Sequence, residues 1–400
     1  MAADVAAESP TETIPRSYHW WLGAALASQL GDVVVLFAIA WTASAHGGRL
    51  AGLVSASMTL PRTVLLLAGG VLADRLSART VMLACDATMV IVAGALALTS
   101  AWSTPAWTLL AFGLVSGTVS AFYLPASGSM PRRLVGATLL PRALALRLAG
   151  SQVVSLVGPP LAGLLVVAAG LGGTAALDAL TFAVVLLVLV KVVSAPERLT
   201  PSQHNVLRDA ADGIRLTLGD PRLRPALLLT GVVAGLVLPT GSLLVPLLAR
   251  ARDWSAPTVG LTLGAQAVGG ILVSLLVSRR GAYARAGLAA AASVAPMSLG
   301  MALLAAIPVG SVASVGGLLI GAGVGLFASH IGPIVLGSSP ESHLNRVQAV
   351  VALVQSVPLL VTVNVLGNLA AATSPATTLL VTAATLAATG LAAGSRLSHL

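Results

Sequence analysis

The sequence predicts an all-α integral membrane protein with twelve transmembrane helices in two pseudo-symmetric six-helix bundles. Of its 400 residues, 56% are hydrophobic and only 9% are charged, and the mean hydropathy is +0.95. These values lie far outside the range of soluble globular proteins. The apolar residues form repeated stretches of the roughly 20 residues that a helix needs to cross a bilayer core of about 30 Å. Short breaks bearing arginine or proline separate these stretches.

We expect one transmembrane helix in each of the following stretches: 18–44, 50–73, 80–100, 105–126, 143–168, 172–193, 226–249, 257–278, 284–306, 311–336, 346–371 and 374–394. Residues 1–17 are polar and acidic, without the apolar run and cleavage site of a signal peptide, so we expect a disordered cytoplasmic tail there. Residues 395–400 form a second short tail.

The longest polar stretch, 194–225, divides the chain into an N-terminal bundle, 18–193, and a C-terminal bundle, 226–394. Apolar residues recur in it at helical spacing beside charged ones, which is typical of an amphipathic helix on the inner membrane face. A simple linker is the alternative. The apolar residues concerned are Val206, Leu207, Ala210, Ile214 and Leu218.

The two bundles resemble each other weakly. A shift of about 208 residues superposes the fourth and tenth predicted helices, as expected of the duplicated halves of many secondary transporters. The matched pairs are Gly113 with Gly321, Gly117 with Gly325, and Pro125 with Pro333.

Arginine placement predicts the orientation, because basic residues are retained on the cytoplasmic side of a membrane. With both termini inside, nearly all arginines, Arg147 among them, lie in or beside cytoplasmic segments, and Arg49, Arg250 and Arg252 are the exceptions. We therefore expect a multi-pass protein of the inner (cytoplasmic) membrane with both termini in the cytoplasm. The formal charge of +9 then needs no nucleic-acid partner, since no water-exposed basic domain is predicted.

Ionisable groups inside a bilayer are costly and point to function. Asp32 lies about fourteen residues into the first helix and Arg62 about eleven residues from the inner end of the second, so both lie near the midplane at 1.5 Å per residue. We expect them to form an ion pair in which Asp32 carries the transported proton and Arg62 tunes its affinity. A static pair that fixes two helices is the alternative. We expect Asp86 and Asp178 nearer the interfaces, solvated or hydrogen-bonded.

Few aromatic residues are left to line a cavity, because the tryptophans lie near the span ends. A cavity of aliphatic and small side chains with a few amides is expected, which suits an apolar or amphiphilic substrate. Hydrogen bonding between helices is the alternative role of these amides. The candidates are Gln29, Gln152, Gln266, Gln355 and Asn364.

Several segments resemble the major facilitator superfamily, in particular its drug- and siderophore-exporter branch. The resemblance covers nearly the whole chain and implies twelve helices and alternating access between two halves. It is carried by the segments Ser28 to Asp32, Gly70 to Arg79, Leu124 to Ala126, Pro131 to Val135, Gly158 to Gly163 and Asp220 to Arg224.

The segment from Gly70 to Arg79 is the most informative of these. Gly70 permits close helix packing, and Asp74 can cap the next helix or pair with Arg75 or Arg79. The resemblance implies that this loop is a conformational switch. Ser77 and Ala78 stand where the family usually has glycine and a basic residue, which weakens the match. A basic topogenic loop with a helix cap is the alternative.

The fifth predicted helix combines glycines with two consecutive prolines. Proline removes a backbone donor and bends a helix, so a bent surface of small residues can pack tightly against a helix of the other half. The resemblance links this motif, here Gly158, Pro159 and Gly163, to exporters that exchange substrate for protons. A plain kink is the alternative.

Other function classes find little support. No nucleophile with a base, no metal-ligand cluster and no phosphate-binding loop is recognisable, so we predict neither an enzyme, nor a metal site, nor an ATPase. Cys85 has no partner cysteine.

We therefore expect a monomeric, proton-coupled exporter, surrounded by membrane lipid, of a drug, siderophore or secreted metabolite. A proton gradient supplies its energy and it needs no cofactor. An importer or facilitator of the same fold, or a membrane sensor that transports nothing, is the alternative.

Overall fold

The protein is described by a computed structural model that covers residues 13–75, 77–192, 223–281, 283, 285–337 and 344–397. Within these ranges helices account for all of the regular secondary structure. The predicted all-α class is therefore confirmed. The predicted N-terminal tail lies almost wholly outside the described residues, as does the amphipathic helix expected near Val206 to Leu218.

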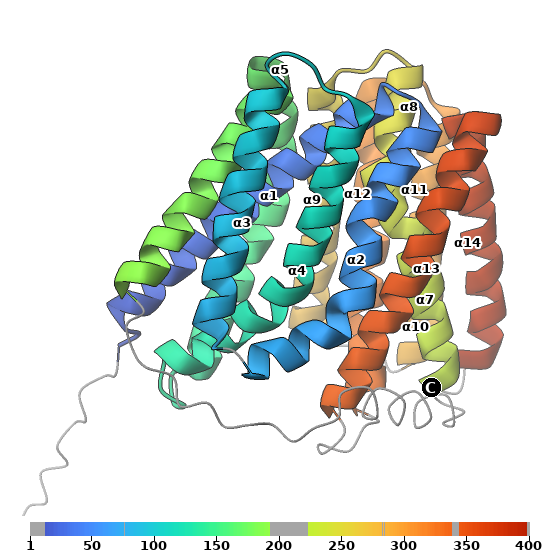
Figure 1. Cartoon of the computed structure of the whole chain (residues 1–400). Coiled ribbons are helices and arrows are strands. Elements are labelled where there is room, and N and C mark those ends of the chain that lie inside the picture. The colour runs from blue at the N-terminus through green and yellow to red at the C-terminus, as the bar shows by residue number, and fades with distance from the viewer. Residues whose placement is uncertain are drawn as a thin grey trace, which may run out of the picture.

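The first half contains five helices. They are α1 (Arg16–Ser44), α2 (Gly48–Arg75), α3 (Ala78–Thr99), α4 (Ala106–Leu134) and α5 (Leu140–Val192). The predicted span 143–168 and all but the last residue of the predicted span 172–193 fall within α5, which turns back on itself in Figure 1. The turn lies at Gly170, whose φ of 63° and ψ of −169° are non-helical and favour glycine.

The second half has more helices because two predicted spans are interrupted. Its elements are α7 (Leu223–Pro239), a π-helical turn (Thr240–Leu244), α8 (Val245–Ala251), α9 (Ala256–Arg280), α10 (Ala286–Ala292), α11 (Val294–Ala306), α12 (Gly310–Gly337), α13 (Leu344–Ala372) and α14 (Pro375–Leu397). The π turn comes just before Pro246, which cannot donate a backbone hydrogen bond to the preceding turn.

Among the described residues, 10 helices are long and apolar enough to cross a membrane. One of them is α5. At 1.5 Å per residue its length would exceed twice the thickness of the bilayer core if it were straight, but the break at Gly170 divides it into two arms. The helix α2 is not among the ten, and it carries Arg49 and Arg62. Large apolar side chains such as Leu98 and Val167 are exposed on the helix surfaces, as expected of a protein in lipid.

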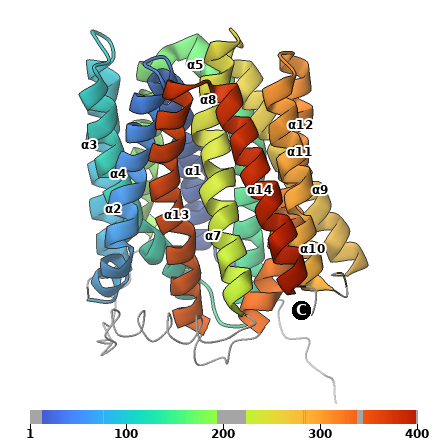
Figure 2. The ribbon, with the colours of Figure 1, turned by 90° about the vertical axis from the view of Figure 1, so that its right-hand side faces the viewer.

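The helices run side by side between two ends of the molecule (Figures 1 and 2). We call the end where α1 begins and α14 finishes the linker end. The opposite end, where α1 is followed by α2 and α13 by α14, is the hairpin end.

Small residues let α5 of the first half lie very close to α9 of the second half. A Cβ atom on Gly163 would lie 2.7 Å from the carbonyl oxygen of Ala256, and one on Gly264 would lie 2.6 Å from Cγ of Pro160. Such separations are shorter than side chains allow, so glycine is required here. The tight packing of the fifth helix against the other half, predicted from the Gly-Pro motif, is present in the structure.

A second pair of helices, α2 and α13, joins the halves in the same way. A Cβ atom on Gly48 would meet the carbonyl oxygen of Gly367 at 2.5 Å, and one on Gly52 would meet that of Val363 at 3.0 Å. Gly48 and Gly52 begin α2, and Gly367 lies near the end of α13, so this contact is at the hairpin end. The contact between Gly163 and the start of α9 is at the same end.

Candidate functional site

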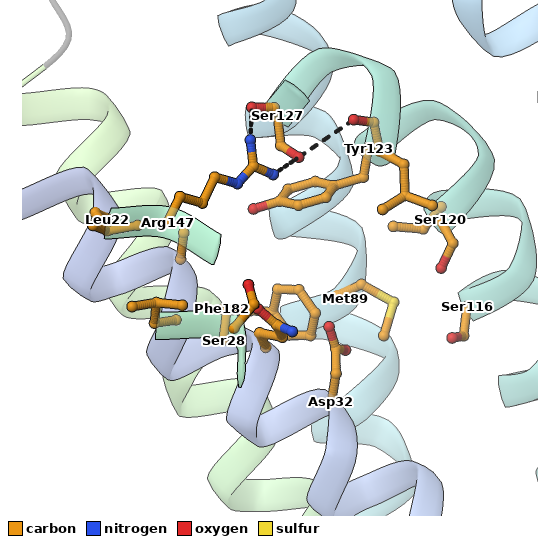
Figure 3. Close-up of a pocket in the computed structure, with 16 residues that line it drawn as sticks. Leu22, Ser28, Asp32, Met89, Ser116, Ser120, Tyr123, Ser127, Arg147 and Phe182 are labelled. Atoms are coloured by element: carbon orange, nitrogen blue, oxygen red, sulfur yellow. Dashed lines mark hydrogen bonds between the residues drawn. The ribbon is translucent and has the colours of Figure 1, made fainter. Parts of the chain in front are cut away.

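The helices of the first half enclose a polar cavity of about 150 Å³. Residues of α1, α3, α4 and both arms of α5 line it, and Figure 3 shows them. The lining residues are Leu22, Ala25, Leu26, Ser28, Gln29, Asp32, Met89, Ser116, Val119, Ser120, Tyr123, Leu124, Ser127, Arg147, Ser151 and Phe182. The five serines, with Gln29 and Tyr123, give it a surface that water can wet.

Polar contacts connect the helices around this cavity. The Ser151 hydroxyl of α5 donates to Oε1 of Gln29 on α1 over 3.0 Å. The Tyr18 hydroxyl of α1 donates to the carbonyl oxygen of Ala143 on α5. The predicted cavity candidate Gln29 therefore lines a cavity and also forms a hydrogen bond between helices, so its two expected roles coexist.

Arg147 is a cavity residue that the sequence analysis missed. Its Nη1 and Nη2 donate to the carbonyl oxygen and Oγ of Ser127 over 3.0 and 3.3 Å, and its guanidinium carbon lies 5.5 Å from the ring centroid of Trp21. In Figure 3 the guanidinium points towards Ser127 and away from Asp32. The sequence did contain a signal, because Arg147 lies four residues inside the predicted span 143–168. We used it only to assign the orientation of the chain in the membrane.

Asp32 lines the cavity, as its predicted functional role requires, but it does not pair with Arg62. Among the described residues no ion pair joins the two, and Arg62 is exposed on α2, away from the cavity lining. The reason is the position of α2, which packs against α4 and α13. The α4 glycines Gly113 and Gly117 face Ser57 and Met58 of α2. The predicted ion pair is thus absent from this conformation.

Asp86 and Asp178 are not near solvent, contrary to the sequence analysis. Both side chains have an exposed fraction of 0%, and neither carboxyl has a hydrogen-bond partner among the described residues. Asp178 of α5 lies against α1, since a Cβ atom on Gly31 would be 2.8 Å from its Oδ1. Distance from the span ends did not reveal this, because the neighbouring helices bury both positions.

A second cavity, of about 300 Å³, lies between α5 of the first half and α9 and α12 of the second. Two predicted cavity residues, Gln152 and Gln266, line it together with Ser155 and Ser274. This arrangement places one amide from each half in the same cavity. The other two candidates lie elsewhere: Gln355 is exposed on α13, and Asn364 donates to the carbonyl oxygen of Leu360 on its own helix.

A third cavity, of about 590 Å³, is apolar and lies between α7, α13 and α14, which stand side by side in Figure 2. Leu227, Val232, Leu236 and Val354 are among its lining residues. The hydroxyl of Thr362 also lines it, and carbonyl oxygens of α7 and α13 satisfy that hydroxyl. Its lining includes the exposed residues Leu228 and Val357, so this cavity opens on the helix surface. The aliphatic lining that we expected of a central cavity stays a prediction, and the cavity around Asp32 is polar.

The predicted switch from Gly70 to Arg79 is described only in part. The side chains of Asp74 and Arg75 lie outside the described residues, and Gly70 is described as part of the backbone of α2. Arg79 donates to the carbonyl oxygens of Leu189 and Val190 at the end of α5. Ser77, whose Oγ accepts from the Thr80 amide, caps α3, so the capping role that we expected of Asp74 belongs to Ser77.

Comparison with known proteins places the chain in a family. The sequence profile of the Major Facilitator Superfamily matches residues 21–363. The chain belongs to this superfamily. Among curated proteins, none matches its sequence.

Solved structures of other transporters share the fold of this superfamily member. A mutant of the nucleoside transporter NupG is 13% identical, with a TM-score of 0.74 over 95% of this chain and 98% of that one. An autoinhibited peptide transporter of the POT family is also 13% identical, with a TM-score of 0.74 over 96% of each chain. At this identity the likeness shows the fold alone, and the superfamily indicates a membrane transporter.

Proposed function

We propose that this superfamily member is a proton-coupled exporter of a hydrophobic or amphiphilic small molecule, working by alternating access between its two halves. The observation that carries the proposal is the position of Asp32. This carboxyl lies in the interior of the first half and lines a polar cavity that water can enter. A buried carboxyl with access to water can bind a proton and release it again, which proton coupling requires.

The helix contacts support alternating access. In this conformation the halves touch at the hairpin end through α5 with α9 and α2 with α13. Glycines form both contacts, so the backbones approach without interlocking side chains, and the surfaces can separate with little rearrangement. Separation of the halves at the hairpin end would open the molecule to that side. Contact of the halves at the hairpin end would leave the cavities open to the linker end instead.

The arginines support a cytoplasmic linker end. Arg132 and Arg133 lie in the last turn of α4, and Arg279 and Arg280 lie in the last turn of α9. Both helices finish at the linker end, where the positive-inside rule favours the cytoplasm. The present conformation would then be closed towards the outside of the cell.

Two cavities support a substrate with both apolar and polar groups. The amides of Gln152 and Gln266 offer hydrogen bonds between the halves, where alternating access needs the substrate to bind. The apolar cavity beside α7 has the 300–1,000 Å³ size that drug-like ligands fill. The Gly-Pro motif of α5, by its resemblance to exporter sequences, favours export.

One observation favours the alternative of an importer or facilitator of a polar solute. Five serines line the cavity around Asp32, namely Ser28, Ser116, Ser120, Ser127 and Ser151. Hydroxyl groups at this density suit a ligand that forms several hydrogen bonds. The direction of flux distinguishes this alternative from export.

Uptake into inside-out membrane vesicles tests the proposal. The vesicles receive a panel of lipophilic cations, macrolides and siderophores, with or without an acid-inside proton gradient. We expect the gradient to drive accumulation of at least one compound in the wild type and not in Asp32→Asn. Asp253→Asn is the matched control, because Asp253 is exposed between α8 and α9 and asparagine tolerates its φ of 53°.

The outcomes separate the two functions. Accumulation that needs the gradient and Asp32 supports a proton-coupled exporter. Equilibration of a polar panel member without regard to the gradient would support the facilitator. Loss of accumulation in Asp253→Asn as well would show that the effect of Asp32→Asn is not specific to Asp32.

A further inference from the structure

Asp86 on α3 and Asp178 on α5 are two buried acids that the proposed mechanism leaves unused. Their carboxyl oxygens are inaccessible to solvent and have no hydrogen-bond donor among the described residues. An unpaired charge in such surroundings would cost several kcal/mol, so the neutral, protonated form is favoured at both positions.

Both acids belong to the surroundings of Asp32. The carboxyl of Asp178 packs against Gly31, the residue next to Asp32 in the chain. Met89, which follows Asp86 by three residues on α3, lines the cavity together with Asp32. Helices α1, α3 and α5 therefore bring three carboxyl groups to the surroundings of one cavity, although they lie far apart in the sequence.

Other titratable groups nearby include Tyr123 and Arg147, which line the same cavity, and Cys85, which precedes Asp86 in the chain. The Arg147 guanidinium donates to Ser127 and points away from Asp32 (Figure 3). Several negative charges in one interior are costly, so the protonation states of the three carboxyls depend on one another.

Two apolar side chains of the cavity lining lie on the same helix faces as the buried acids. Phe182 comes four residues after Asp178 and Met89 three residues after Asp86, so each shares a helix face with its acid, and both line the cavity. Methionine is flexible, and a change of rotamer would admit water to the acid behind it. A proton that travels from the cavity to either acid would pass one of these side chains.

We propose that Asp86 and Asp178 are exchangeable proton sites that act together with Asp32, so that the first half binds and releases more than one proton in each transport cycle. This inference rests on the proposed function. Protons suit the cluster better than a metal ion, because no group of three acidic, histidine or cysteine side chains among the described residues has the spacing of a metal site.

Proton counting on the purified full-length protein in lipid nanodiscs tests the inference. The solution is stepped from mildly alkaline to mildly acidic, and a pH-sensitive dye reports the protons bound per molecule. We expect Asp86→Asn and Asp178→Asn each to bind one proton fewer than the wild type. Asparagine has nearly the same shape as a protonated aspartic acid. Asp253→Asn serves as the exposed control.

An infrared measurement guards against loss through misfolding. In folded protein the carbonyl stretch of a protonated carboxyl should change during the pH step in the wild type, and part of this change should be missing in each variant. An unchanged proton count and infrared difference in both variants would overturn the inference, because both acids would then keep one protonation state. A count that depends on sodium would also overturn the assignment to protons alone.

The same variants separate this inference from the proposed function. If vesicles show gradient-driven transport but the proton counts are unchanged, only the inference fails. If the counts fall in Asp86→Asn and Asp178→Asn while transport ignores the gradient, the proton sites stand and the proposed function fails.

Discussion

The guanidinium of Arg250 on α8 lies 3.7 Å from the ring centroid of Trp41 on α1, and its Nη2 donates to the Trp41 carbonyl oxygen over 3.2 Å. This contact joins residues 209 positions apart, one from each half of the protein. It lies at the hairpin end, where the glycine contacts also hold the halves together. Arg250, which our orientation analysis treated as an exception, thus has a structural role at this end.

Replacing Arg250 by glutamine should loosen the hairpin end. A cation–π contact at a partly exposed site contributes about 1 kcal/mol, so its loss should raise the open population about fivefold. In a Cys85→Ser background, a cysteine placed at the buried Ser44 should react correspondingly faster with a water-soluble thiol reagent. Arg49→Gln is the control, since Arg49 is exposed at the same end. Equal reaction rates in Arg250→Gln and in its parent would show that the contact does not hold the halves together.

Gly163→Ala should force α5 and α9 apart. The new Cβ would meet the Ala256 carbonyl oxygen at 2.7 Å and Cα of Pro257 at 2.9 Å, and overpacking of this kind costs about 1–3 kcal/mol. Spin labels at Ala45 and Thr373, in different halves of the hairpin end, should show a longer distance by pulsed electron paramagnetic resonance. Gly94→Ala is the matched control because nothing lies within 4 Å of its Cβ position. The wild-type distance in both variants would show that Gly163 does not set the separation of the halves at this end.

Arg147→Ala should destabilise the first half. The change removes two hydrogen bonds to Ser127 and the stacking on Trp21, and leaves the Ser127 hydroxyl without its donor. We expect a loss of about 1–3 kcal/mol, with only partial rescue by Arg147→Lys, because lysine lacks the planar fork. Thermal unfolding in detergent measures the effect. Arg142→Ala, on an exposed face of the same helix, should leave the midpoint unchanged, and an equal shift in both variants would contradict the prediction.

Gly31→Ala should separate α1 from the second arm of α5. The added methyl group would lie 2.5 Å from Oγ1 of Thr181 and 2.8 Å from Oδ1 of Asp178. Thermal unfolding should show a loss of about 1–3 kcal/mol, whereas Gly23→Ala on the same helix, with nothing within 4 Å, should be neutral or slightly stabilising. A neutral Gly31→Ala would mean that the two helices do not approach as closely as described.

The sequence predicts the helices well because apolar length and the breaks between spans are local properties. Several helices begin within a few residues of their predicted starts, for example those that follow Pro105, Ser255 and Ser374. The interruptions at Thr240 and Ser293 were not predicted, since hydropathy does not distinguish an α-helix from a π turn or a kink. The Gly-Pro pattern of α5 predicted its close packing, because only small residues permit such an approach.

The candidate site was less predictable, because helix packing decides which faces meet. Asp32 and Arg62 share a predicted depth, yet α2 turns Arg62 away from the cavity that Asp32 lines. Asp178 was assigned by its distance from the span ends and Arg147 by its place beside a cytoplasmic segment, and their neighbours come from other helices. Depth along a helix can be counted from the sequence, but rotation about its axis requires the partner helices.

The exchange of substrate for protons at Asp32 is the central claim, and proton movement tests it directly. A panel compound that accumulates in acid-inside vesicles is added outside, and a trapped dye follows the internal pH. We expect the compound to raise the internal pH in the wild type and in Asp253→Asn, but not in Asp32→Asn. The same rise in Asp32→Asn, or accumulation in the wild type without any rise, would contradict the claim.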